Sequence, residues 1–189
     1  MTKAVIAIGS NRAGTWGPPA RALTKTIYML REQGIIVDRC SRAFSTRPVN
    51  MPMQPNVLNA VLAIKTGLPP ATLLRLLKVI ERRAGRSCVI MSRARPLDLD
   101  LVAYGGRVIG WPLPASDRGR RQYGRLIVPH PFMHLRPFVL VPMAEVAPRW
   151  VHPVFGQTTL EMLKRLPLAD RRLRASPGRL LPGQAEAIA

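Results

Sequence analysis

The sequence predicts an α+β domain with a mainly antiparallel sheet. Short apolar strands and amphipathic helices alternate irregularly along the 189 residues, and the strands are joined by hairpin-like links as well as helical ones. A doubly wound parallel sheet would instead require regular alternation of strands and helices. The length is enough for one ordinary domain with a substantial core.

The first half of the chain is expected to supply strands and two helices. KAVIAIGSN is typical of a short buried strand ending in a turn, and apolar residues at helical spacing then predict a helix from Ala20 to Gln33. IIVDRCSRAFST alternates like one half-buried strand, a proline-broken loop follows, and VLNAVLAI is the next strand. Pro69 and Pro70 suit the start of the second helix.

The second half begins with a strand in RPLDLDLVAYGG, whose paired glycines predict a tight turn into RVI. A basic, loop-like stretch follows from Gly110 to Arg125, and VPHPFMHLRPFVLVPMAEVAP is expected to start with a turn and to contain a short helix. A last amphipathic stretch surrounds Leu160 to Leu166. We therefore expect one domain over residues 1–166 and a basic, mobile tail over residues 167–189.

The composition predicts a basic protein without a membrane span. Lys and Arg number 29 against 10 Asp and Glu, which gives a formal net charge of +19. Such a field attracts polyanions, including nucleic acid, anionic lipid and nucleotide phosphates, and charge alone does not choose among them. No uncharged run approaches the roughly 18 residues of a span, and the first apolar stretch is too short for a secretory signal. A cytoplasmic location is expected, with Cys40 and Cys88 as small buried hydrophobes.

Two carboxylates stand two residues apart in the strand RPLDLDL. Positions i and i+2 of a strand share a face, so Asp98 and Asp100 lie side by side, with Leu97, Leu99 and Leu101 opposite. Their mutual repulsion has to be offset by a metal ion or by arginine. Mg²⁺ binds through one or two carboxylates plus substrate phosphates, and two metal ions can clamp a phosphoryl displacement. A salt-bridged pair is the structural alternative, and the motif alone leaves both open.

Other polar side chains in apolar surroundings are candidate ligand contacts. Asn59 is the only polar side chain in VLNAVLAI, so its amide pairs either with backbone or with a ligand such as a heterocycle edge. Phe138 belongs either to the core or to a stacking platform. In VPHPFMHLRPF, a proline between His130 and His134 argues against a helical metal pair. His130 and Arg136 instead suit a phosphate pocket.

Four segments together resemble a known family in order and approximate spacing. AIGSN, LNAV, RPLDLDL and VPHPFMHLRPFVLVPMAEVAP resemble the signature segments of the 6-hydroxymethyl-7,8-dihydropterin pyrophosphokinases, over roughly Ala4 to Pro148. Enzymes of this family move a diphosphate from ATP to a pterin alcohol in folate biosynthesis and release AMP. The resemblance implies a ferredoxin-like, three-layer αβα arrangement of the sheet, ATP as co-substrate and two Mg²⁺ ions.

The resemblance also assigns roles to individual residues. The implied catalytic residues are Arg86, Arg95, Asp98 and Asp100, with the two aspartates as magnesium ligands. The implied ATP contacts are Lys78, Glu81, Arg95, Leu101, Arg125, His130 and Arg136. The implied pterin contacts are Thr46, Pro48, Val49, Asn59 and Phe138.

One position departs from the family pattern. Val57 stands before LN, where the family usually carries a ring, so one side of the pterin would face an aliphatic side chain. The implied partners are the small molecules ATP and pterin and neighbouring folate-pathway enzymes, while nucleic acid is expected only as a nonspecific ligand of the tail. Two alternatives stay open. One is a catalytically degenerate relative. The other is a basic RNA-binding α+β module, which the charge favours and the 5% aromatic content does not.

Overall fold

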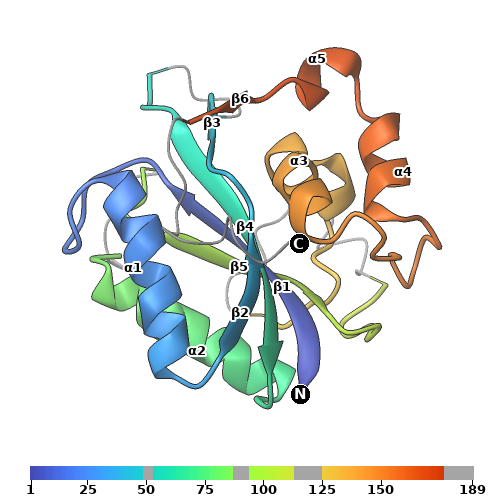
Figure 1. The fold of residues 1–189 in the computed structure, drawn as a ribbon, viewed down its shortest axis with the longest axis horizontal. Coiled ribbons are helices and arrows are strands. Elements are labelled where there is room, and N and C mark those ends of the chain that lie inside the picture. The colour runs from blue at the N-terminus through green and yellow to red at the C-terminus, as the bar shows by residue number, and fades with distance from the viewer. Residues whose placement is uncertain (49–52, 87–93, 113–124, 177–189) are drawn as a thin grey trace, which may run out of the picture.

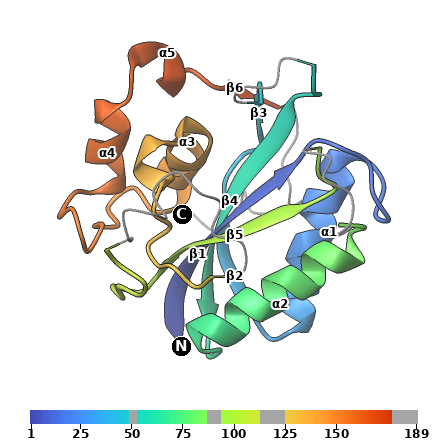
Figure 2. The same cartoon turned by 180° about the vertical axis from the view of Figure 1, so that it is seen from behind.

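A six-stranded antiparallel sheet lies between two layers of helices (Figure 1). The computed structural model describes residues 1–48, 53–86, 94–112 and 125–176. Two helices, α1 (Pro19–Glu32) and α2 (Pro70–Arg83), cover one face of the sheet (Figure 2). The other face is covered by α3 (Pro137–Val146) and α4 (Thr159–Arg165). This arrangement confirms the predicted α+β class and its three layers.

The strand order is β5-β1-β4-β3-β6, with β2 also paired to β4. The strands are β1 (Thr2–Ser10), β2 (Ile36–Cys40), β3 (Phe44–Thr46), β4 (Val57–Thr66), β5 (Asp98–Tyr104) and β6 (Arg174–Ala175). All of their pairings are antiparallel. Up to β5 the elements follow the β-α-β-β-α-β order of a ferredoxin-like fold, if β2 and β3 are taken as one interrupted strand.

The interruption between β2 and β3 corrects the prediction of a single strand over IIVDRCSRAFST. Ser41 lies at the break, where its hydroxyl accepts a hydrogen bond from the Val61 N–H at 2.9 Å. The same hydroxyl donates to the carbonyl oxygen of Arg42 at 2.8 Å. The Ser41 hydroxyl thus accepts a hydrogen bond that a backbone carbonyl oxygen would accept in a regular sheet. Side chains of Ser compete with regular secondary structure in this way.

The turn after β5 also differs in part from the prediction. Gly105 adopts a positive φ of 54°, and the Arg107 N–H donates to the Tyr104 carbonyl oxygen at 3.1 Å, so the tight turn is confirmed. The RVI segment does not return along β5, however. Ile109 instead forms an isolated antiparallel bridge with Val128, which joins it to the start of the VPHPF segment.

Two apolar cores lie on the two faces of the sheet. The core under α1 and α2 includes Leu97, Leu99 and Leu101, as the alternation predicted. The core under α3 and α4 contains Met133 and Leu140. No helix in the described ranges is long and apolar enough to cross a membrane.

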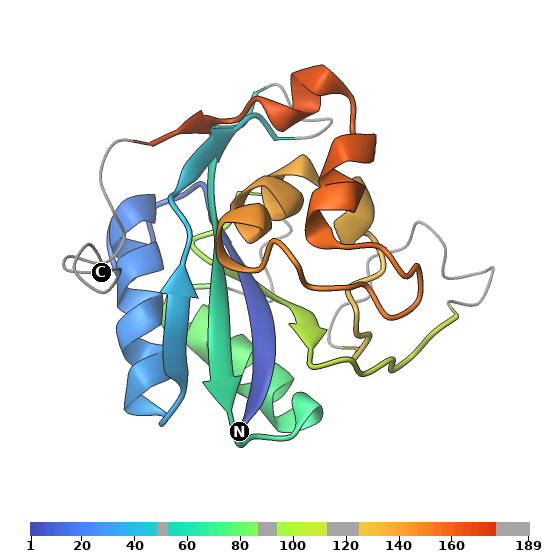
Figure 3. The same ribbon diagram turned by 45° about the vertical axis from the view of Figure 1, so that its right-hand side comes forward.

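The expected tail begins with ordered structure. After α4 the chain forms a short helix, α5 (Leu168–Arg171), and then β6, which pairs with the outer edge of β3. Figure 3 shows this segment passing from α4 to the sheet edge. The boundary expected at residue 166 therefore does not coincide with the last strand of the sheet. Residues 177–189 lie outside the described ranges.

Cys40 is half-buried and free. Burial, with the nearby charge of Glu145 as the second cause, raises the pKa of its thiol to about 12, so the side chain stays protonated and apolar. Cys88 lies outside the described ranges.

A buried histidine should make the fold sensitive to acid. The His152 ring is fully buried, stacks on Phe155 at 4.3 Å, and accepts the Val154 and Phe155 N–H groups at Nδ1. Burial, and secondly His134, lower its pKa to about 4. Because the unfolded chain binds this proton near pH 6.5, stability contributed by neutral His152 is lost as the pH falls from about 6.5 to about 4.

Denaturant unfolding at several pH values checks this expectation. His152→Asn keeps an acceptor near the Nδ1 position and removes the titration, so its stability should depend less on pH over that interval than the wild type's, with a slope difference of up to about 1.4 kcal/mol per pH unit. Equal slopes in the two proteins would contradict the assignment.

Candidate active site

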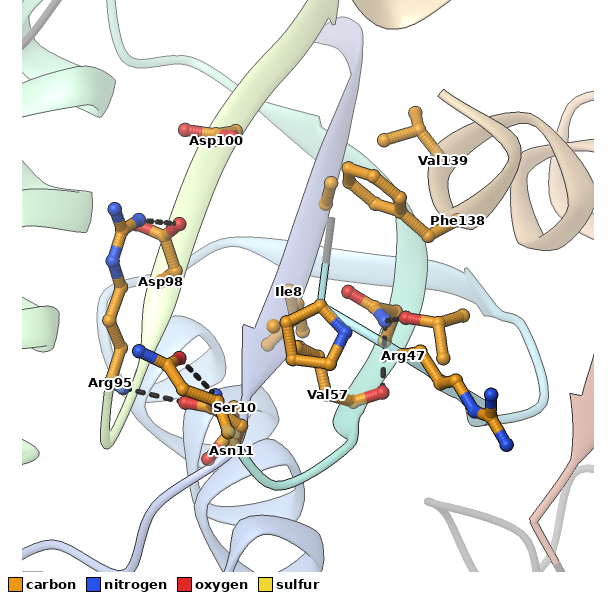
Figure 4. Close-up of a pocket in the computed structure, with 16 residues that line it drawn as sticks. Ile8, Ser10, Asn11, Arg47, Val57, Arg95, Asp98, Asp100, Phe138 and Val139 are labelled. Carbon is orange, nitrogen blue, oxygen red and sulfur yellow. Dashed lines mark hydrogen bonds and ion pairs between the residues drawn. The ribbon is translucent and has the colours of Figure 1, made fainter. Parts of the chain in front are cut away.

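The two aspartates of β5 open into a pocket of about 230 Å³ (Figure 4). Its walls come from the ends of β1 and β4, from β3, from β5 and from the start of α3. The lining residues are Ala7, Ile8, Gly9, Ser10, Asn11, Thr46, Arg47, Pro48, Gln54, Val57, Asn59, Arg95, Asp98, Asp100, Phe138 and Val139. The predicted carboxylates, amide and ring thus meet in one cavity.

Asp98 is held by two arginines. Arg86 Nη1 lies 2.7 Å from Asp98 Oδ1, and Arg95 Nη1 contacts Asp98 Oδ2. Burial opposes ionisation of this carboxyl, but the charges of Arg95 and Arg86 outweigh burial and lower its pKa. Asp98 is therefore ionised, and the arginine alternative left open by the sequence is realised at this residue.

The buried carboxylate of Glu81 holds Arg86, one of the two arginines that contact Asp98. Glu81 is 2% exposed, and its oxygens pair with Lys78 Nζ at 2.7 Å and with Arg86 Nη1 at 2.6 Å. It also accepts the N–H of Leu99, the residue between the two aspartates, at 2.7 Å. Burial is the main cause that raises the pKa of Glu81, and the charge of Lys78 acts against it. Glu81 thereby ties the end of α2 to β5.

Asp100 has a different environment although it shares the face of Asp98. The Asp100 carboxylate lies 3.6 Å from Arg136 Nη1 and 4.0 Å from His130 Nε2, and within the described ranges it accepts no hydrogen bond. Burial and then the negative charge of Asp98 raise its pKa. Figure 4 shows Asp100 further along the strand than the Arg95–Asp98 contact. An added cation would relieve this repulsion.

The donor set fits a magnesium ion. The described residues contain no group of three or more His, Cys, Asp or Glu side chains that could hold a metal. The pocket does supply two same-face carboxylates, 27% and 35% exposed. Mg²⁺ is usually bound by one or two carboxylates, with waters and substrate phosphates completing the coordination.

His130 lies beside Asp100 in neutral form. Burial first, and then the charge of Arg136, lower its pKa to about 3. The Phe132 N–H donates to Nδ1 at 3.2 Å, which places the ring proton on Nε2. Nε2 lies 4.0 Å from Asp100 Oδ2 and 3.2 Å from Arg136 Nη1, and because a guanidinium only donates, the Nε2 proton is available to a carboxylate or ligand oxygen and not to Arg136.

The opposite end of the pocket presents an oriented amide. Asn59 Nδ2 donates to Thr46 Oγ1 at 2.8 Å and to the Val57 carbonyl oxygen at 3.1 Å. Its Oδ1 accepts nothing from the described residues and lies where a Cβ added at Gly9 would approach to 3.3 Å. Glycine at position 9 thus keeps the amide oxygen accessible. Phe138 and Val57 lie on opposite sides of the pocket (Figure 4).

The polar end of β1 fastens the loops around the pocket, a role that the AIGSN motif did not predict. Asn11 Oδ1 accepts the Arg95 N–H at 2.6 Å, and Asn11 Nδ2 donates to Gln54 and Pro55. Ser10 Oγ donates to the Pro96 carbonyl oxygen at 2.7 Å. The only sequence signal was a small polar pair at a strand end.

The remaining predicted residues lie around the pocket or outside it. Arg86, His130 and Arg136 are not among the lining residues but lie beside Asp98 or Asp100. Lys78 and Glu81 pair with each other, and Glu81 also contacts Arg86. Leu101 is 4% exposed and packs in the core on the other side of the sheet, so only its backbone is available to a ligand. Arg125 is exposed. Val49 lies outside the described ranges.

Comparison with known proteins identifies a family whose model covers most of the chain. The family model for 7,8-dihydro-6-hydroxymethylpterin-pyrophosphokinase (HPPK) matches residues 5–148. A 2-amino-4-hydroxy-6-hydroxymethyldihydropteridine pyrophosphokinase of Synechocystis is 37% identical over 164 residues, which are 86% of this chain and 75% of the relative. The Haemophilus influenzae protein of the same name is 34% identical over 92% of this chain and 97% of its own length.

Longer proteins also contain a similar segment. A mitochondrial folate synthesis bifunctional protein of Arabidopsis thaliana is 37% identical over 142 residues, only 23% of its length. The solved Plasmodium falciparum HPPK-DHPS shares the fold with a TM-score of 0.59 at 14% identity, over 85% of this chain and 43% of that one. Because the family model covers residues 5–148, and relatives of 37% and 34% identity align over 75% and 97% of their own lengths, this chain belongs to the HPPK family.

Proposed function

We propose that this protein transfers diphosphate from ATP to 6-hydroxymethyl-7,8-dihydropterin, giving the pterin diphosphate and AMP. The observation that carries the proposal is the shared pocket: the carboxylate pair and the Asn59–Phe138 end line one cavity. A nucleoside triphosphate bound at Asp98 and Asp100 and a flat heterocycle bound at Asn59 would therefore lie next to each other. The family and the names of its single-function members support the same reaction.

The proposed reaction is a direct in-line displacement. The pterin hydroxymethyl oxygen forms a bond to the β-phosphorus of ATP, the bond from that phosphorus to the oxygen bridging it to the α-phosphorus breaks, and AMP leaves with that oxygen. The hydroxyl proton passes to solvent or to the phosphate oxygens. Such transfers depend mainly on positioning and charge stabilisation, so no covalent intermediate with the enzyme is needed.

Each group of the pocket has a proposed role in this reaction. Asp98 and Asp100 would hold two Mg²⁺ ions, which neutralise the phosphate charge when bound. Arg86 and Arg95, which contact Asp98, would stabilise charge that moves toward AMP. Neutral His130, with Arg136, would donate hydrogen bonds to phosphate oxygens. Asn59 and Phe138 would fix the pterin by its hydrogen-bonding edge and its face.

The nucleotide product tests the proposal most directly. Purified protein is incubated with ATP and Mg²⁺, with and without the pterin, and AMP and ADP are separated by chromatography. Pterin-dependent AMP in a one-to-one ratio with pterin diphosphate is expected. ADP as product would indicate an ordinary kinase, and no nucleotide product would favour a degenerate or RNA-binding protein.

Two wider features belong to the same proposal. The reaction would take place in the cytoplasm, and an enzyme of a neighbouring folate step is a candidate partner, because the Arabidopsis relatives are bifunctional folate synthesis proteins. Co-purification of a tagged chain from its own cells would test the partner.

The side chain of Val57 offers a test of the pterin end. Val57→Tyr would add a ring on the side of the pocket opposite Phe138. Because an aromatic contact is worth about 0.5–1.5 kcal/mol, we expect the pterin KM to fall by roughly two- to thirteenfold with the ATP KM unchanged. Steady-state kinetics with each substrate varied in turn measures both constants. Val57→Ile is the matched control, and an equal effect in the two variants would contradict a stacking site here.

A further inference from the structure

The C-terminal segment Pro167–Ser176, here called the C-terminal strap, connects α4 with β3, whose last residue, Thr46, lines the pocket. One end follows α4, in the helix layer that also contains α3 and Phe138. The other end is β6, which pairs with β3 through Phe44↔Ala175 and Ser45↔Arg174. Figure 3 shows the strap crossing from the helices to the outer edge of the sheet.

Both ends of the strap are attached by specific hydrogen bonds. Arg171 donates through Nε to the Leu166 carbonyl oxygen at 2.7 Å and through Nη2 to the Lys164 carbonyl oxygen, which binds α5 to the last turn of α4. At the other end the Ser176 N–H donates to the Ala43 carbonyl oxygen at 2.8 Å. The segment between these contacts spans the sheet edge.

The strand that the strap reaches carries an essential part of the pterin end. β3 has three residues and would be an edge strand without β6. Its last residue, Thr46, accepts the hydrogen bond that orients the Asn59 amide with Oδ1 toward the pocket. A three-residue edge strand held on one side only is expected to fray, and the Thr46 hydroxyl would then lose its fixed position.

We propose that the C-terminal strap is a positioning element for the pterin end of the site, acting through β3 and Thr46 on the Asn59 amide. The inference rests on the proposed function and adds a specificity role for residues that touch no substrate. The phosphate end is held separately, by Glu81, Arg86 and the loop contacts of Asn11. Loss of the strap should therefore affect the pterin and leave ATP binding unchanged.

Two truncations compare the strap with the residues beyond it. Stopping the chain after Leu166 removes the strap and keeps the buried Leu166, whereas stopping after Ser176 keeps the strap and removes residues 177–189. For the first, we expect the pterin KM to rise by about fivefold, the effect of one lost hydrogen bond, with the ATP KM unchanged. The second should behave as the full chain.

A point variant keeps the test valid if the shorter chain does not fold. Ser176→Pro removes the N–H that bonds to Ala43, and Ser176→Ala keeps it, so only the proline should raise the pterin KM. In a Thr46→Val background the proline should add little, because the orienting hydroxyl is already absent. An unchanged pterin KM, or an equal rise of both KM values, would overturn the inference. Absence of AMP formation by the wild type would instead refute the proposed function.

Discussion

Asp100→Asn should lower AMP formation by about a hundred- to a thousandfold and leave the folded protein at least as stable as the wild type. The substitution removes one of two carboxylates available to Mg²⁺, and losses of this size are usual when a group that stabilises transferring charge is deleted. Stability should not fall, because burial and the charge of Asp98 already disfavour the ionised form of Asp100, as its raised pKa indicates. The asparagine relieves that repulsion.

Single-turnover assays and denaturant unfolding measure the two effects, and a titration with Mg²⁺ should show a higher concentration for half-maximal rate. Asp38→Asn is the matched control, since Asp38 is a surface carboxylate paired with Lys65 at 3.0 Å. It should change neither quantity. Wild-type activity in the Asp100 variant would refute the metal role, and a marked loss of stability would refute the electrostatic description of the site.

Asp98→Asn should differ from Asp100→Asn in one respect. Asp98 neutralises Arg86 and Arg95, so its removal leaves two guanidinium groups close together in a half-buried site. Activity and stability should then fall together. This asymmetry within one D-x-D motif comes from partners that lie elsewhere in the chain.

The sequence predicted those parts of the fold that depend on local periodicity. The two-residue repeat of β5 placed Asp98 and Asp100 on one face and Leu97, Leu99 and Leu101 on the other, and the structure confirms it. The α2 start at its proline pair was equally local. The break at Ser41 was not predicted, because it depends on one side-chain hydroxyl that accepts the backbone N–H of Val61 on the neighbouring strand. β6, with two residues, is too short to show any period.

The sequence indicated which residues line the pocket better than it indicated how they are arranged. The resemblance brought Asn59, Phe138 and the aspartates together, and one pocket contains them. Nothing in the residue pattern distinguished Asp98 from Asp100, because the distinction depends on two arginines from elsewhere in the chain. Arg86 follows the end of α2, and Arg136 lies between η2 (Met133–Leu135) and α3. Glu81 was expected to contact the nucleotide, but it is buried and pairs with Lys78 and Arg86. The packing of α2 against β5 determines these contacts, and the sequence pattern does not show it.

Glu81→Gln should therefore reduce the free energy of unfolding by about 1–3 kcal/mol, the usual cost of leaving a buried hydrogen-bonding group unsatisfied. The Glu81 carboxylate lies between Lys78 and Arg86 and accepts the Leu99 N–H, and an amide can replace only one of its two accepting oxygens. Its raised pKa shows that burial works against the charge, so the network is not a large net source of stability. Breaking it is costly because the single accepting oxygen of the amide has to serve three donors, Lys78 Nζ, Arg86 Nη1 and the Leu99 N–H.

The same variant should lower activity beyond its effect on folding. Arg86 Nη1 bonds to Glu81 and to Asp98 at once, so losing Glu81 removes one of the contacts that fix the guanidinium beside the pocket. Urea unfolding, with the rate measured under conditions where both proteins are folded, separates the two effects, and Glu32→Gln on the exposed end of α1 is the control. A stability change within about 0.5 kcal/mol of the wild type would mean that β5 and α2 are held together mainly by their apolar contacts. A normal rate in the folded variant would mean that Arg86 is positioned by Asp98 alone.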